Sequence, residues 1–178
     1  MEIPGRRKKD GPTKAVKELA LYCILLVSGG FFAGPVRKLL HVSDRTLFRY
    51  VADLKKAGLI PDLKSETTDG KTEFIFDRDD LYDLTEDDPP AGPLADPQLN
   101  RMRRLVLIDL FFCEQEYYDI YFDPDIDFEP GERVYAAQLV AWLEEKGAAG
   151  VSLRSVQRDV RDVLKARGMC REFEERYM

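Results

Sequence analysis

Residues 42–59 read VSDRTLFRYVADLKKAGL, and this stretch decides the fold expected for the N-terminal half of the chain. Ser43 is a favourable N-cap, and apolar side chains recur at three- and four-residue spacing from Leu47 to Leu54. The pattern predicts an amphipathic helix over residues 43–57, ended by Gly58. Its outer face would carry Arg45, Thr46, Phe48, Arg49 and Ala52.

The flanking sequence predicts two further helices before this one and a hairpin after it. An apolar pattern of helical period begins at Thr13 and ends at Ser28-Gly29-Gly30, and Pro35 suits the first turn of a short helix over residues 36–40. Residues 62–65 and 72–76 alternate with period two around Asp69-Gly70, a strong turn signal. Three helices followed by a hairpin predict a winged helix-turn-helix, the hairpin being the wing.

The string VSDRTLFR, followed by Ala57-Gly58-Leu59, resembles the DNA-binding part of DeoR-like and WYL-type bacterial transcriptional regulators. Their pattern here is VS-x-R-T-hydrophobic-x-R with a glycine-containing exit to the wing, and the resemblance covers about residues 14–77. It implies that the helix over residues 43–57 enters the major groove of double-stranded DNA. It also implies a sensor domain of WYL type, but no segment of these 178 residues corresponds to one. Ligand control is therefore not carried over, and the sequence leaves open whether the protein has a small-molecule effector.

The chain contains an internal repeat. Residues 151–166 read VSLRSVQRDVRDVLKA and match residues 42–57 at eight of sixteen positions, including Ser43 with Ser152, Arg45 with Arg154 and Arg49 with Arg158. A match that keeps both the apolar period and two outward arginines predicts a second helix-turn-helix, so the expected fold is mainly α with a small β-wing and two tandem units.

The second unit should consist of helices over residues 100–115, 133–146 and 152–167, with one short strand after Gly168. The middle helix would bury Val134, Leu139, Val140, Trp142 and Leu143. The third helix would present side chains suited to base-edge and phosphate contacts: Arg154, Ser155, Gln157, Arg158 and Arg161.

The chain has a net charge of −6, and its charged residues are unevenly distributed. Residues 1–78 carry 15 Lys and Arg against 10 Asp and Glu, whereas residues 101–178 carry 12 against 16. We expect a disordered basic arm over residues 1–12, a winged helix-turn-helix over 13–78, an acidic, proline-rich linker over 79–99 and the second unit over 100–178.

An acidic insertion over residues 116–132 lies between the first two helices of the second unit. Its aromatic side chains are too many for a purely exposed loop, so they either cover the second core or contact another subunit, and we expect a homodimer formed through them. The residues are Tyr117, Tyr118, Tyr121, Phe122 and Phe128. Two further alternatives concern the first unit: Phe48 either touches a thymine methyl or packs against its neighbours, and Lys71 of the wing either reaches a phosphate or is simply solvated.

Catalytic, metal-dependent and membrane functions find no support in the sequence. No phosphate loop, dinucleotide fingerprint or nucleophile–base pairing is visible, so we expect neither an enzyme nor a bound cofactor. One histidine and no CxxC argue against zinc, and the acidic run after Asp123 has Phe128 where a calcium loop needs glycine. The longest apolar run, Leu19–Val27, is too short to span a membrane. Three widely spaced cysteines argue against a disulfide framework, and Cys23 and Cys113 are expected to be buried thiols. We expect a cytoplasmic protein, associated with the nucleoid if it binds DNA.

The sequence thus predicts a transcriptional regulator that binds double-stranded DNA through helix 43–57 and through helix 152–167. The alternative is a protein-interaction module, in which the acidic second unit docks a partner instead of DNA. On DNA, one chain could occupy two adjacent major grooves across a flexible linker, or a dimer could place only its N-terminal units on a palindrome. We favour the dimer from the sequence, because the acidic half has poor electrostatics for entering a groove.

Overall fold

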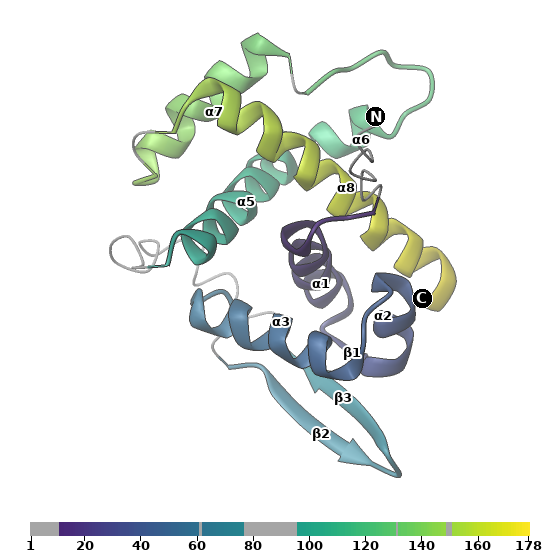
Figure 1. The fold of residues 1–178 in the computed structure, drawn as a ribbon. Helices are drawn as coiled ribbons and strands as arrows, with labels where there is room; N and C mark the ends of the chain where they lie inside the picture. The colour runs from purple at the N-terminus through teal and green to yellow at the C-terminus, as the bar shows by residue number, and fades with distance from the viewer. Residues whose placement is uncertain (1–10, 61, 77–95, 131, 149–150) are drawn as a thin grey trace, which may run out of the picture.

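The computed structural model describes residues 11–60, 62–76, 96–130, 132–148 and 151–178 (Figure 1). Within them the protein is mainly helical with a small antiparallel sheet. The elements are α1 (Lys14–Ser28), β1 (Gly30–Phe32), α2 (Ala33–Leu40), α3 (Asp44–Lys56), β2 (Lys64–Thr68), β3 (Lys71–Ile75), α5 (Pro97–Glu114), α6 (Tyr117–Tyr121), α7 (Arg133–Glu145) and α8 (Leu153–Tyr177). The predicted arm over residues 1–12, apart from its last two residues, and most of the predicted linker lie outside the described residues.

Local capping explains why the first three helices agree with the sequence analysis. Thr13 Oγ1 accepts a hydrogen bond from the amide of Val16, and Gly29 ends α1 in the left-handed region at φ 69°. Ser43 Oγ caps α3 by accepting from the amide of Thr46 at 3.2 Å. The second helix begins at Ala33, three residues before the predicted start, and His41 closes it at φ 50°.

The predicted wing is present as the antiparallel pair β2 and β3, joined by Asp69 and Gly70 with φ of 52° and 72°. The third strand, β1, was not predicted, since three residues are too few for a period to show. It pairs antiparallel with β3 and gives the sheet the order β1-β3-β2. A Cβ at Gly30 would lie 2.6 Å from the carbonyl oxygen of Phe74, so only glycine allows this approach.

The second half has the three predicted helices with shifted ends. The first of them, α5, begins at Pro97 because Asp96 caps it, its carboxylate accepting from the amide of Gln98 at 2.8 Å. In α7 the buried line is Ala136, Leu139 and Leu143, whereas Val134 is 64% exposed. The prediction that Val134 is buried was therefore wrong, because it lies off the line of three- and four-residue steps that faces the core.

The predicted strand after Gly168 was also wrong, because α8 continues to Tyr177. Gly168 lies on the exposed side of the helix with open space around it. Glycine costs only about 1 kcal/mol relative to alanine within a helix. That cost is offset by the next two turns, where Cys170 and Phe173 continue the buried line of Val163 and Ala166.

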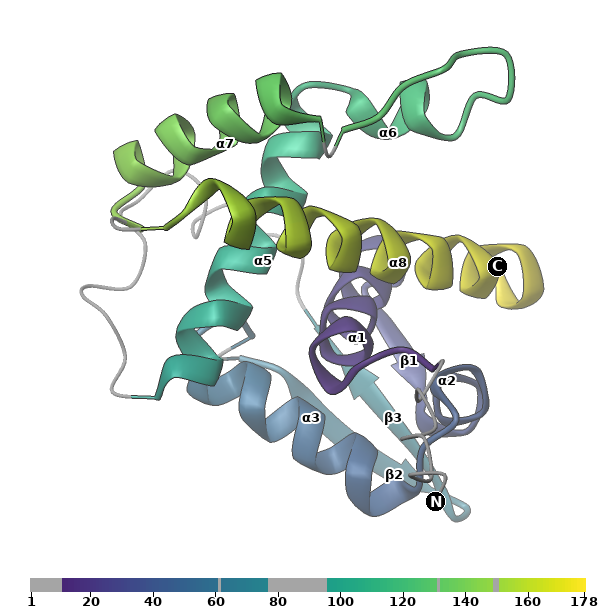
Figure 2. The same cartoon turned by 45° about the horizontal axis from the view of Figure 1, so that its top comes forward.

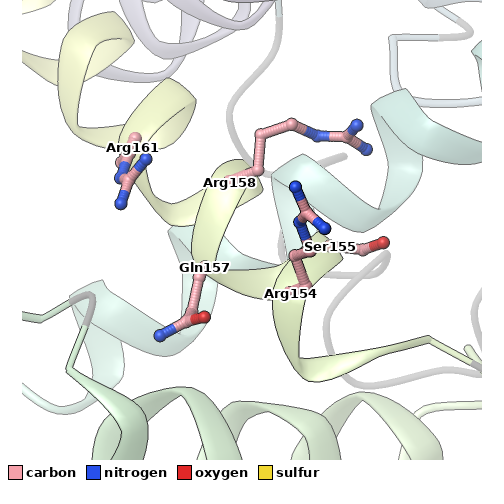
Figure 3. A pocket seen from close by; sticks show the side chains of 5 residues that line it. All are labelled: Arg154, Ser155, Gln157, Arg158 and Arg161. Carbon is pink, nitrogen blue, oxygen red and sulfur yellow. The ribbon is translucent and has the colours of Figure 1, made fainter.

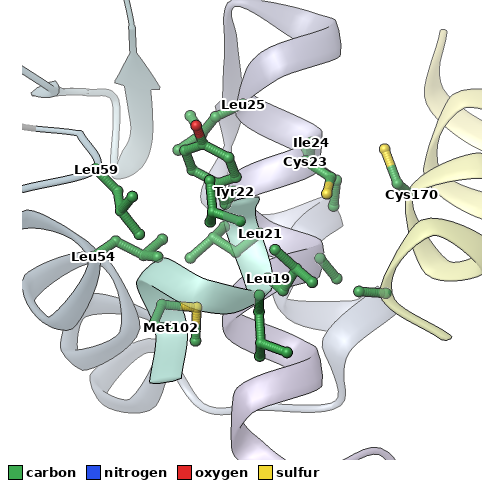
Figure 4. Packing of buried hydrophobic residues seen from close by; sticks show 14 of the residues in the cluster. Leu19, Leu21, Tyr22, Cys23, Ile24, Leu25, Leu54, Leu59, Met102 and Cys170 are labelled. Atoms are coloured by element: carbon green, nitrogen blue, oxygen red, sulfur yellow. The ribbon is translucent and has the colours of Figure 1, made fainter. Parts of the chain in front are cut away.

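This longer α8 joins the two halves of the chain. It runs across α1 in both views of the ribbon and makes its most extensive contact there (Figures 1 and 2). Side chains from α3, α5 and α8 surround α1, among them Leu54, Met102 and Cys170 (Figure 4). The buried side chains of both halves form one hydrophobic cluster. The N-terminal and C-terminal halves therefore share a core.

Candidate nucleic-acid interface

The outer face of α3 carries two arginines that face solvent. Arg45 and Arg49 are exposed, and neither forms an ion pair with any described residue. Asp44, in the first turn, is paired with Arg37 of α2 at 3.3 Å, which offsets the one acidic charge at the start of the helix. An uncompensated pair of guanidinium groups at the beginning of a capped helix is the arrangement that major-groove contacts use.

Ser43 and Thr46, both predicted to contact DNA, are engaged in capping. Ser43 Oγ accepts from the amide of Thr46 and donates to Thr46 Oγ1 at 3.0 Å. Both residues hold the start of α3 in place, and each hydroxyl oxygen keeps a lone pair for a further contact. Their placement thus fits a positioning role better than a base contact.

Phe48 packs against a neighbouring ring and leaves part of its own ring exposed. Its ring lies 5.4 Å from that of Phe74 on β3, yet Phe48 remains 45% exposed. Together with Phe32 and Lys71 it lines a cleft of about 530 Å³ that α2, α3 and the wing enclose. Lys71, predicted as a possible phosphate contact, is thus on the same side of the molecule as the outer face of α3.

The turn between α2 and α3 adds basic side chains that the sequence analysis missed. Arg37, Lys38 and His41 line a hollow of about 610 Å³ beside Ser43. In DNA-bound helix-turn-helix proteins the helix before the recognition helix crosses the DNA backbone. Arg37 and Lys38 lie on α2, the helix that precedes α3 here. The signal in the sequence was two consecutive basic residues in the last turn of the short second helix.

The predicted contact residues of the second unit lie together on α8. All five project from its first turns, where they line a hollow of about 460 Å³ (Figure 3). The residues are Arg154, Ser155, Gln157, Arg158 and Arg161. The three arginines are exposed. The hollow is therefore a basic one.

The acidic residue next to this hollow, Asp159, is neutralised by arginines of α5. Asp159 is fully buried and takes hydrogen bonds from Arg101 at 3.0 Å and Arg104 at 2.7 Å, both on α5. Arg158 lies 3.8 Å from the same carboxylate and is otherwise open to solvent. The overall acidity of the second half therefore does not extend to the first turns of α8.

Helices α3 and α8 are built with matching contacts. Ser152 Oγ accepts from the amide of Ser155 at 3.2 Å, as Ser43 does from Thr46. Each helix also receives an ion pair from the first helix of its own half, Lys14 to Asp53 at 2.7 Å and Arg101 to Asp162 at 2.5 Å. Asp53 and Asp162 are aligned in the internal repeat. The sequence match is thus accompanied by equal structural roles.

A buried carboxylate, that of Glu18, lies beside the Lys14–Asp53 ion pair that joins α1 to α3. Glu18 on α1 is 6% exposed, and its Oε1 lacks a hydrogen-bond partner among the described residues although Lys14 lies 3.3 Å away. Burial raises the pKa of Glu18 to about 7, against the attraction of Lys14. Burial also disfavours the charged form of Asp53, but hydrogen bonds from Lys14 and Glu18 and the attraction of Lys14 and Lys56 together outweigh it, so the pKa of Asp53 is lowered.

We expect the free energy of unfolding to fall as the pH rises from about 4.5 to about 7. The folded state holds the Glu18 proton more tightly than the unfolded state, so this stabilisation is complete below pH 4.5 and lost above pH 7. The difference is at most about 3 kcal/mol. Urea unfolding at several pH values should show that Glu18→Gln flattens this slope, whereas Glu145→Gln, at an exposed position, retains it. An unchanged slope in Glu18→Gln would contradict the assignment.

The aromatic side chains of the insertion cover the second core. Tyr117 packs against Phe111, Phe112, Phe128 and Tyr135, with ring centroids 5.2–5.8 Å apart. Tyr118 and Phe122 are each covered by an arginine of α8, Arg167 and Arg171 respectively. Tyr121 is the most exposed of the predicted contact residues, at 36%. The first of the two alternatives, packing on the chain's own core, accounts for most of these rings.

The cysteines are not suited to redox chemistry at neutral pH. Burial raises the pKa of the Cys23 thiol well above its usual value and that of Cys170 to about 12. Cys113 lies at the surface, so its predicted burial was wrong, since α5 turns that position away from the core. Desolvation of its sulfur nevertheless raises the Cys113 pKa to about 11.

None of the described helices has the length and apolar character that crossing a membrane requires. In the same part of the chain, no cluster of three or more His, Cys, Asp or Glu side chains is placed to hold a metal ion. Comparisons with protein-family models, with curated proteins and with solved structures find no match to this chain. The case for function therefore rests on the geometry of α3, the wing and α8.

Proposed function

We propose that this protein is a sequence-specific regulator of transcription that binds double-stranded DNA, with α3 and the start of α8 as its two recognition helices. The observation that carries the proposal is the pair of exposed arginines on α3, Arg45 and Arg49, beside Lys71 of the wing. A recognition helix flanked by a basic turn and a basic wing provides both base-edge donors and phosphate contacts. The matching cap and ion pair of α8 support the same role for Arg154 and Arg158.

The sequence suggested either one chain with a flexible linker or a dimer on a palindrome. The shared core favours a third arrangement on DNA. Because α8 packs on α1, the two recognition helices hold a fixed relation that does not depend on residues 77–95. The rings that motivated a homodimer are largely occupied within the chain. We therefore propose that one chain binds one continuous site with both helices, and light scattering of the protein–DNA complex would check its stoichiometry.

Selection of bound sequences from a random duplex library tests DNA binding. We expect one enriched site, to which Arg45→Ala or Arg49→Ala binds more weakly by about 1–3 kcal/mol each if the residue contacts a base. Lys55→Ala is the matched control, because it removes one exposed charge from the same helix near its other end. No enriched site, or equal losses in all three variants, would contradict sequence-specific binding through α3.

The same site tests the second unit. Arg154→Ala and Arg158→Ala should also weaken binding, and more than Lys165→Ala, which removes an exposed charge further along α8. Each effect should persist when the flanking DNA is shortened to the selected site. If the arginine variants bind as the wild type does, the alternative holds for this unit, and its arginine face docks a protein partner.

A further inference from the structure

Two exposed aromatic side chains face the cleft that α2, α3 and the wing enclose. Phe32 is 51% exposed and Phe48 is 45% exposed, and both line the same space of about 530 Å³. The ring of Phe48 is supported by buried Phe74, with centroids 5.4 Å apart. Large apolar side chains grouped at a surface indicate contact with an apolar group of a partner.

The rim of the cleft is polar and carries a net positive charge, which suits an anionic partner. Lys71 stands on the wing side, and the Arg37–Asp44 ion pair stands on the side of α2. Arg45 precedes Phe48 by three residues and Arg49 follows it directly, so the apolar ring lies within the basic outer face of α3. The partner that fits is one that presents a small apolar group on a polyanion.

We propose that this cleft holds the 5-methyl group of one thymine, with Phe48 as the residue that selects it. The inference rests on the proposed binding of DNA by α3. The thymine methyl is the apolar group that a base pair presents in the major groove, so it is the natural partner of an apolar side chain on a recognition helix. Because Phe74 holds the Phe48 ring, the contact is made by a side chain already in place.

Uracil substitution isolates that single methyl group. Each thymine of the selected duplex is replaced in turn by deoxyuridine, and the dissociation constant of the full chain is measured at fixed salt. One position should weaken binding about three- to fivefold, the contribution of one buried methyl group. In Phe48→Ala that position should no longer distinguish thymine from uracil, whereas Ile75→Ala, exposed on β3 outside the cleft, should distinguish them as the wild type does.

A second variant distinguishes loss of the Phe48 contact from loss of the fold. Phe48→Gln places on α3 the residue that occupies the aligned position of α8, Gln157. We expect it to unfold at a similar temperature to wild type, to lose the uracil effect and to shift the selected base at that position toward adenine. A duplex that binds tightly but shows no uracil effect, or an effect that survives in Phe48→Ala and Phe48→Gln, overturns this inference alone. A protein that selects no duplex overturns the proposed function, and the inference with it.

Discussion

Arg167→Ala is expected to lower the free energy of unfolding by about 3–5 kcal/mol, because it leaves a buried carboxylate without its charge partner. Arg167 on α8 holds Asp109 on α5 through two hydrogen bonds, from Nε at 2.6 Å and Nη2 at 2.7 Å. Asp109 is fully buried, and it also accepts from Tyr118 of α6 and from Cys23 of α1. Four helices thus meet at one carboxylate.

Two further variants show whether the charge or the packing is responsible. Arg171→Ala, one turn later, removes an exposed arginine that lies over Phe122, and we expect about 1 kcal/mol or less from it. The double variant Asp109→Leu with Arg167→Met replaces the pair by apolar side chains and should be more stable than Arg167→Ala alone. Chemical denaturation measures all of these. Equal stability of the Arg167→Ala and Arg171→Ala proteins would refute the proposed role of the pair.

Phe173→Ala should cost a similar amount, about 3–5 kcal/mol, because it creates a cavity in the core that both halves share. Phe173 is 5% exposed and lies in the part of α8 that follows Gly168. Together with Cys170 it continues the buried line of the helix and helps to close the core around α1. Removal of this contact should loosen both halves together, so a single unfolding transition should move to lower temperature.

Tyr177→Ala is the matched control, since Tyr177 is on the same helix, one turn later, and is 44% exposed. Its loss should change the melting temperature little. Unfolding followed both by far-ultraviolet circular dichroism and by fluorescence of Trp142, in the second half, would report whether the halves melt together. Two separate transitions in the wild-type protein would contradict a shared core.

The pieces of this protein that the sequence predicted are those specified by neighbouring residues. The cap at Ser43, the spacing from Leu47 to Leu54 and the Asp69-Gly70 turn each act within a few positions, so α3 and the wing were predicted within one to three residues of their ends. The outward arginines of α3 and α8 followed from the same period. Boundaries that depend on burial, such as the end of α8, could not be predicted from these local patterns.

What only the tertiary structure decided is how the two units meet and which charges are buried. Asp109 and Arg167 are 58 positions apart, and in the sequence each looks like an ordinary surface residue of a helix. Glu18 is buried because Lys14 and α3 close over it, although nothing in its own sequence environment marks it. Local patterns determine which elements form, because capping and helical period are local interactions. The pairing of those elements is decided by burial summed over the whole chain, and here that sum extends α8 across α1 to join the two halves.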